Sequence, residues 1–142
     1  MAHADGGEPL PWPTYRILGV TARLEELKIN RRLAHLHLTQ GSLEALESVA
    51  DLEPATISDL AVLMSVSKQS LGKVLCRLES LVLVSKERGS DARSTIITLT
   101  ARGRTVLATA EKLLDAMAEP GTGDDAALRR SLQQHLNDLR KN

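Results

Sequence analysis

Two helical patterns between residues 56 and 81, each preceded by a hydroxyl side chain that can cap a helix, constrain the fold of this chain most. Thr56 is followed three residues later by Asp59, a variant of the capping box that starts a helix. Ser67 is placed to cap a second helix that ends at about residue 81. Because only residues 65 and 66 remain for the connection, the segment predicts a helix-turn-helix.

The second of these helices is predicted to have one apolar and one polar face. The polar face carries no bulky apolar group, so it can enter the major groove of DNA as a recognition helix. At about 100° per residue, the apolar arc holds Leu71, Val74, Leu75, Leu78 and Leu81, and the polar arc holds Gln69, Gly72, Lys73, Cys76 and Ser80.

The segment that follows predicts a β-hairpin. Two strands are expected, at residues 82–86 and 95–100, and the second is rich in β-branched residues. The polar loop between them, residues 87–94, carries Arg88 and Arg93. A hairpin with a basic tip forms a wing, whose arginines suit a narrow minor groove. The predicted fold class is therefore mainly α with a small β-hairpin wing.

The rest of the chain is expected to be helical around this unit. Residues 1–13 are rich in Gly and Pro and predict a flexible arm. Apolar spacing predicts helices at residues 14–37 and 39–51, and Thr100 can cap a helix that runs to about residue 118. A last helix is expected at about residues 124–139. A chain of 142 residues is long enough for one domain.

Charge is sorted along the chain, although its 18 basic and 18 acidic residues cancel. Neutrality alone argues against a nucleic-acid ligand, because phosphate contacts need Lys and Arg. Residues 39–66, however, have five acidic residues and no Lys or Arg, a net charge of −5. Residues 67–104 have eight basic and three acidic residues, a net charge of +5. The basic segment is the candidate contact surface.

Several classes of protein are disfavoured. One cysteine cannot form an internal disulfide, and neither a signal sequence nor a run of about 18 apolar residues is present, so we expect a soluble cytoplasmic protein without membrane contact. His35 and His37 point away from each other on a helix and lack further ligands, so no metal or other cofactor is expected. Because no nucleophile elbow or phosphate loop occurs, an enzyme is not expected.

The order and spacing of short motifs over about residues 38–104 resemble the winged-helix proteins of the multiple antibiotic resistance regulator (MarR) family. The motifs are Leu38-Thr39, Ser58-Asp59-Leu60-Ala61, Ser67 with Leu78-Glu79, Asp91-Ala92-Arg93, Leu99-Thr100 and Gly103.

The resemblance implies a transcriptional regulator, most simply a homodimeric repressor on a pseudo-palindromic operator, released by a small ligand or an oxidant. Residues 14–37 and 105–142 would form the dimer, and residues 38–104 would bind double-stranded DNA. Lys68, Gln69, Ser70 and Lys73 would face the major groove, Arg93 would be the wing arginine, and Asp91 would orient it. The full set of candidate DNA contacts is Ser67, Lys68, Gln69, Ser70, Lys73, Arg77, Arg88, Asp91 and Arg93.

Two residues depart from ordinary expectations for such a helix. Val82 stands where the family usually has Gly, and because a β-branched residue tolerates a left-handed cap poorly, we expect the recognition helix to end in another way. Gly72 lies inside the helix, where glycine costs about 1 kcal/mol relative to alanine. Gly72 either permits close approach to DNA or is a tolerated weak point in the helix.

The sequence says less about how DNA binding is controlled than about the fold. Cys76 is either an unreactive small residue or, beside Lys73 and Arg77 on the DNA-facing side, a thiol whose oxidation would oppose DNA binding. A ligand pocket could draw on few aromatic or polar groups near the dimerisation helices, so it is expected to be reduced or absent. Its candidate residues are Trp12, Tyr15, Arg16 and His35, with Arg31 as a further option.

An alternative function is a winged-helix module that binds protein and does not read DNA. The two functions differ in their response to salt, because a protein that contacts several phosphates loses affinity steeply as salt rises.

Overall fold

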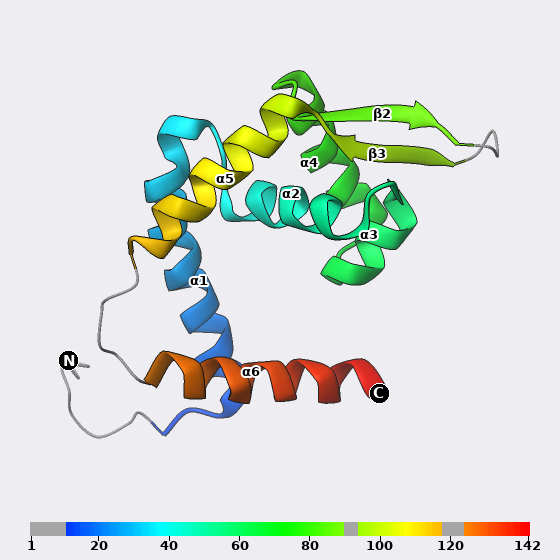
Figure 1. The fold of residues 1–142 in the computed structure, drawn as a ribbon. Helices are drawn as coiled ribbons and strands as arrows, with labels where there is room; N and C mark the ends of the chain where they lie inside the picture. The colour runs from blue at the N-terminus through cyan, green and yellow to red at the C-terminus, as the bar shows by residue number, and fades with distance from the viewer. Residues whose placement is uncertain (1–10, 90–93, 118–123) are drawn as a thin grey trace.

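The computed structural model describes residues 11–89, 94–117 and 124–142. Its described part is mainly helical with one small sheet, which confirms the predicted fold class (Figure 1). In chain order the elements are α1 (Thr14–Leu33), a short 3-10 helix η1 (Ala34–Leu36), α2 (Gln40–Leu52), β1 (Ala55–Thr56), α3 (Ile57–Met64), α4 (Lys68–Ser80), β2 (Val84–Arg88), β3 (Thr95–Leu99), α5 (Ala101–Asp115) and α6 (Asp124–Lys141).

The predicted hydroxyl caps start three of the helices. The Thr56 hydroxyl accepts the Asp59 N–H at 3.1 Å, and the Asp59 carboxylate accepts the Thr56 N–H at 3.4 Å, so the capping box is complete. The Ser67 hydroxyl accepts the Ser70 N–H at 3.0 Å at the start of α4. Thr100 does the same for α5. Local polar chemistry therefore defines where α3, α4 and α5 begin.

The sheet has three antiparallel strands in the order β1-β3-β2. In the hairpin, Val84 lies opposite Leu99 and Arg88 lies opposite Thr95. The two-residue strand β1 was not predicted; its Ala55 pairs with Ile97 across the sheet. This pairing attaches the wing to the start of α3.

The end of α4 contradicts the expectation for Val82. Val82 does adopt the left-handed conformation, with φ of 62°. Its N–H donates to the Glu79 carbonyl and the Leu83 N–H donates to the Leu78 carbonyl, both at 2.9 Å, which is a Schellman motif. Leu78 and Leu83 are both buried, so their packing holds the turn although Val82 disfavours it. Because these residues complete the helix end, β2 begins at Val84 and not at Val82.

The same turn lies against the start of α5. The Leu83 carbonyl accepts the Thr100 N–H at 3.1 Å, and the Thr100 hydroxyl donates to the Val82 carbonyl at 2.6 Å. Gly103 approaches so closely that a Cβ atom there would lie 2.0 Å from the Leu83 oxygen. Glycine is therefore required at this position by close backbone contact and not by a special φ angle.

The first long helix is shorter than predicted. It ends at Leu33 and is followed by η1 and by His37, which has a left-handed φ of 60°. The Leu38 N–H donates to the Leu33 carbonyl at 3.3 Å, and both leucine side chains are buried. The chain turns here because these two side chains enter the core together. The fully buried larger side chains of that core are aliphatic: Leu33, Leu46, Leu60, Leu71, Leu75, Leu78, Leu83, Ile97 and Val49.

Helix α1 extends below α2 and α5, and α6 passes beneath the winged unit and ends on the side of α3 (Figure 1). Among the apolar residues of α6, Leu128 is 56% exposed and Leu132 is 44% exposed, and on α1 Leu24 is 61% exposed. The Arg140 guanidinium near the end of α6 donates to the Leu63 carbonyl of α3. None of the described helices is long and apolar enough to cross a membrane.

Candidate nucleic-acid interface

The two faces predicted for α4 are present. Leu71, Leu75 and Leu78 are buried against the rest of the winged unit. The opposite side of the helix is exposed, and Lys73 and Cys76 lie on it. The same helix presents four of the candidate DNA contacts to solvent: Lys68, Gln69, Lys73 and Arg77.

Ser67 and Ser70, two further candidate contacts, are joined to each other at the start of this helix. The Ser67 hydroxyl lies 2.9 Å from the Ser70 hydroxyl and also accepts the Ser70 N–H. Both residues are exposed. Their first role is therefore to fix the direction in which α4 begins.

The first strand of the wing begins and ends two residues later than the sequence predicts. Arg88 is not in the loop but is the last residue of β2, where it is exposed. The Gly89 N–H donates to the Ser94 carbonyl at 2.9 Å and continues the hairpin beyond the strands. Asp91 and Arg93, which complete the predicted wing, lie outside the described residues, so their role stays a prediction.

Cys76 is exposed on α4, with a cation from the wing beside it. The Lys86 ammonium lies 3.4 Å from the Cys76 sulfur and 3.7 Å from the Glu79 carboxylate. Lys86 was not among the predicted site residues, because only the folded hairpin brings β2 against α4. The oxidation of Cys76 stays a prediction.

One cation of the basic segment stabilises the fold through an ion pair. The Arg104 guanidinium forms an ion pair with the Glu53 carboxylate, which also accepts the Leu99 N–H at 3.0 Å. The hydrogen bond from Leu99 and the neighbouring Arg104 lower the pKa of Glu53, against the opposing effect of burial. Arg104 thus joins α5 to the end of α2, and the candidate interface does not include it.

The opposite shift occurs on α2, whose acidic residues make up much of the −5 segment. Burial raises the pKa of Glu47, and the charges of Glu111, Glu44 and Asp51 raise it further. An acidic surface of this kind repels phosphate, so it is not part of the candidate interface.

The residues predicted for a ligand pocket are not brought together within one chain. The Arg16 guanidinium lies 4.1 Å from the centroid of the Trp12 ring, and Tyr15 is 78% exposed. His35 follows the opposite end of α1, a helix of 20 residues and hence about 30 Å long. A shared pocket would need a second chain. Over the described ranges no cluster of His, Cys, Asp or Glu could hold a metal ion.

A capped helix-turn-helix, a hairpin and an exposed polar helix face define a winged helix-turn-helix protein. No protein-family model and no curated protein sequence matches the chain. Solved structures do match it, and they are regulators of the MarR type. The protein has their fold, as its motifs predict.

Three of these structures show the extent of the likeness. The regulator MOSR of M. tuberculosis, solved in complex with DNA, is 26% identical over 92% of this chain and 98% of its own, with a TM-score of 0.77. MarR of E. coli, solved in its apo form, is 20% identical over 89% of this chain and 98% of its own, with a TM-score of 0.73. MepR of S. aureus, solved with DNA, is 16% identical over 90% of this chain and 98% of its own, with a TM-score of 0.76.

Proposed function

We propose that this protein is a transcriptional regulator that binds double-stranded DNA in a sequence-specific manner. The observation that carries the proposal is α4, a helix buried on its leucine side and exposed on the side of Gln69 and Lys73, directly beside a hairpin. Such a helix fits the major groove, where base edges can be read. The complexes of MOSR and MepR with DNA support the proposal, because both proteins share this fold.

The two candidate elements would have different roles. On α4, the side chains of Gln69 and Lys73 would contact base edges or phosphates in the major groove. At the wing, Arg88 and Arg93 would reach the adjacent minor groove, and Asp91 would orient Arg93. Phosphate contacts from these cations supply most of the affinity, so binding should fall steeply as salt rises.

The DNA-binding form is proposed to be a homodimer built on α1 and α6. Leucines at positions 128, 132 and 136 of α6 follow one another at four-residue steps and share one exposed face. Leu24 and Leu27 of α1 are exposed as well, at 61% and 55%. Most of the stability of a helix in a protein comes from packing of its apolar face, and exposed apolar faces of this kind mark an interface. A second copy of the chain supplies the complementary apolar face.

Release of the DNA by a small ligand or by oxidation of Cys76 stays a prediction, as does repression in preference to activation. A protein-binding winged-helix module is the competing function. Its binding need not weaken with salt, whereas DNA binding must.

The test is an anisotropy titration of the DNA upstream of the protein's own gene at two salt concentrations. We expect binding that weakens steeply with salt and is reduced by Arg93→Ala. Arg130→Ala, which removes the same charge from α6, should bind as the wild type does. Absence of binding, or binding that is insensitive to salt, would refute DNA recognition.

A further inference from the structure

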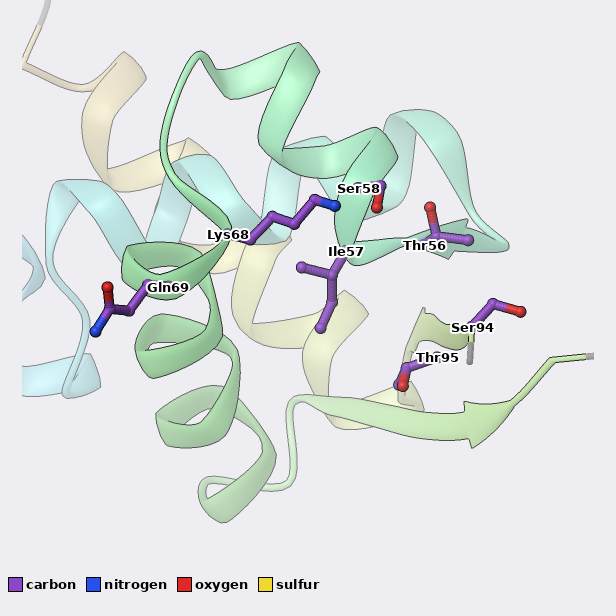
Figure 2. A pocket seen from close by; sticks show the side chains of 7 residues that line it. All are labelled: Thr56, Ile57, Ser58, Lys68, Gln69, Ser94 and Thr95. Carbon is purple, nitrogen blue, oxygen red and sulfur yellow. The ribbon is translucent and has the colours of Figure 1, made fainter. Parts of the chain in front are cut away.

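A hollow of about 540 Å³ opens between the two helices of the helix-turn-helix and the wing (Figure 2). Three parts of the chain line it: the start of α3, the start of α4 and the start of β3. The lining residues are Thr56, Ile57, Ser58, Lys68, Gln69, Ser94 and Thr95.

The lining is suited to an anion. It has hydroxyl groups on two sides, one cation, Lys68, and no carboxylate. Figure 2 shows the Lys68 side chain extended toward Ser58, whereas Gln69 points away from that residue. Asp59, the acidic residue nearest along the chain, is held by the Thr56 N–H in the capping box. Among the ion pairs of the described residues, none involves Lys68.

The position of the hollow follows the geometry of B-DNA. In a duplex, one sugar-phosphate strand separates each major groove from the neighbouring minor groove. If α4 enters the major groove and the wing enters the minor groove, this strand must pass between the two elements. The hollow lies at that place, with Lys68 of α4 on one side and Thr95 of β3 on the other.

We propose that this hollow binds one backbone phosphate of the DNA strand that separates the groove entered by α4 from the groove entered by the wing. The inference rests on the proposed function. Lys68 provides the charge, and the hydroxyls of Ser58 and Thr95 donate hydrogen bonds to the phosphate oxygens.

At this phosphate, Lys68 has a different role from the one predicted, and residues of α3 and β3 belong to the interface. A phosphate carries no base information, so Lys68 does not read sequence; it fixes how deeply α4 sits in the groove. Ser58 and Thr95 were not among the predicted contacts, because each is distant in the chain from the recognition helix.

The experiment compares Lys68→Gln with Lys112→Gln, which removes the same charge from α5. Affinities are measured for a duplex that carries the protein's preferred binding site and for a random-sequence duplex, each at several salt concentrations. Lys68→Gln should lose about tenfold in affinity for each bound protomer, by the same factor on both duplexes. Its log–log salt slope should become shallower by about 0.9 for each protomer. Lys112→Gln should retain the wild-type affinity and slope.

A second comparison locates the phosphate. Single neutral methylphosphonates are placed along the site duplex, one position at a time. One position between the two grooves should weaken the wild type and leave Lys68→Gln unaffected, because the two changes remove the same contact. Ser58→Asp, which suits the first turn of a helix but adds a negative charge to the hollow, should weaken binding while thermal unfolding remains unchanged.

The outcomes separate this inference from the function on which it rests. If the wild type binds DNA but Lys68→Gln and Lys112→Gln behave alike, the phosphate site is wrong and the function stands. If every methylphosphonate affects wild type and Lys68→Gln equally, the phosphate site is again wrong. If the wild type binds neither duplex, both proposals fail.

Discussion

Val82 holds a left-handed backbone conformation that a β-branched residue rarely adopts. It is 57% exposed, so its side chain contributes little packing, and Val82 itself takes part in the hydrogen bonds of the turn only through its N–H and its carbonyl. We expect Val82→Gly to stabilise the protein by about 1 kcal/mol, because relief of the left-handed strain exceeds the entropy that glycine adds to the unfolded chain. Urea unfolding measures the change; a lower midpoint would contradict this account of the helix end.

Two glycines should respond to alanine in opposite directions. At Gly72 a Cβ would meet nothing within 4 Å, whereas at Gly103 it would lie 2.0 Å from the Leu83 oxygen. Gly72→Ala should therefore stabilise the fold by roughly 0.5–1 kcal/mol, since alanine favours the helix. Gly103→Ala should destabilise it by about 3 kcal/mol through backbone displacement. Thermal unfolding of both variants provides the comparison; equal effects would refute the close approach at Leu83.

At the scale of elements, Glu53 connects the end of α2 to both β3 and α5. Its pKa is lowered from 4.5, mainly by the Leu99 N–H, so the carboxylate stabilises the folded state above about pH 4.5. This stabilisation is lost as the pH falls through the lower pKa of the folded state. Glu53→Gln should cost roughly 2 kcal/mol at pH 7 and progressively less in acid.

The control for this prediction is Glu79→Gln. Its carboxylate is half exposed and lies 3.7 Å from Lys86, so its loss should change stability by less than about 1 kcal/mol. A Glu53→Gln variant whose deficit is constant between pH 7 and pH 3 would show that the carboxylate charge does not stabilise the fold.

The elements differ in how far the sequence predicts them. Thr56 and Ser67 each act within three residues, so their helix starts could be predicted from local chemistry. The end of α4 could not, because Val82 is locally unfavourable and is held by the buried packing of Leu78 and Leu83. The strand β1 could not be predicted either, because its two residues become a strand only by pairing with β3.

The residues of the candidate interface also fall into two groups, those that the sequence predicts and those that only the fold brings together. Lys73 and Gln69 were predicted from the periodicity of their own helix. Lys86 beside Cys76, the Glu53–Arg104 ion pair and the hollow at Ser58 each join residues at least ten positions apart. Contacts of that range depend on the fold and have no local signal in the sequence.

In the whole molecule, the proposed DNA-binding form contains two chains. Leu132→Glu combined with Leu136→Glu places two charges on the exposed leucine face of α6 and should convert a dimer into a monomer. Because a dimer doubles the phosphate contacts, the monomer should also bind DNA more weakly. Analytical ultracentrifugation measures the mass. Gln134→Glu, which places a charge on another face of α6, should remain dimeric; a monomeric wild type would exclude the proposed interface.

In the proposed function, two copies of α4 and the wing together read duplex DNA. Selection of bound duplexes from a random-sequence library, followed by sequencing, tests it most directly. We predict enrichment of an inverted repeat whose half-site centres lie about 10 base pairs, one helical turn, apart or at a multiple of that spacing. Failure to enrich any sequence, although the protein is folded and dimeric, would contradict sequence-specific DNA recognition.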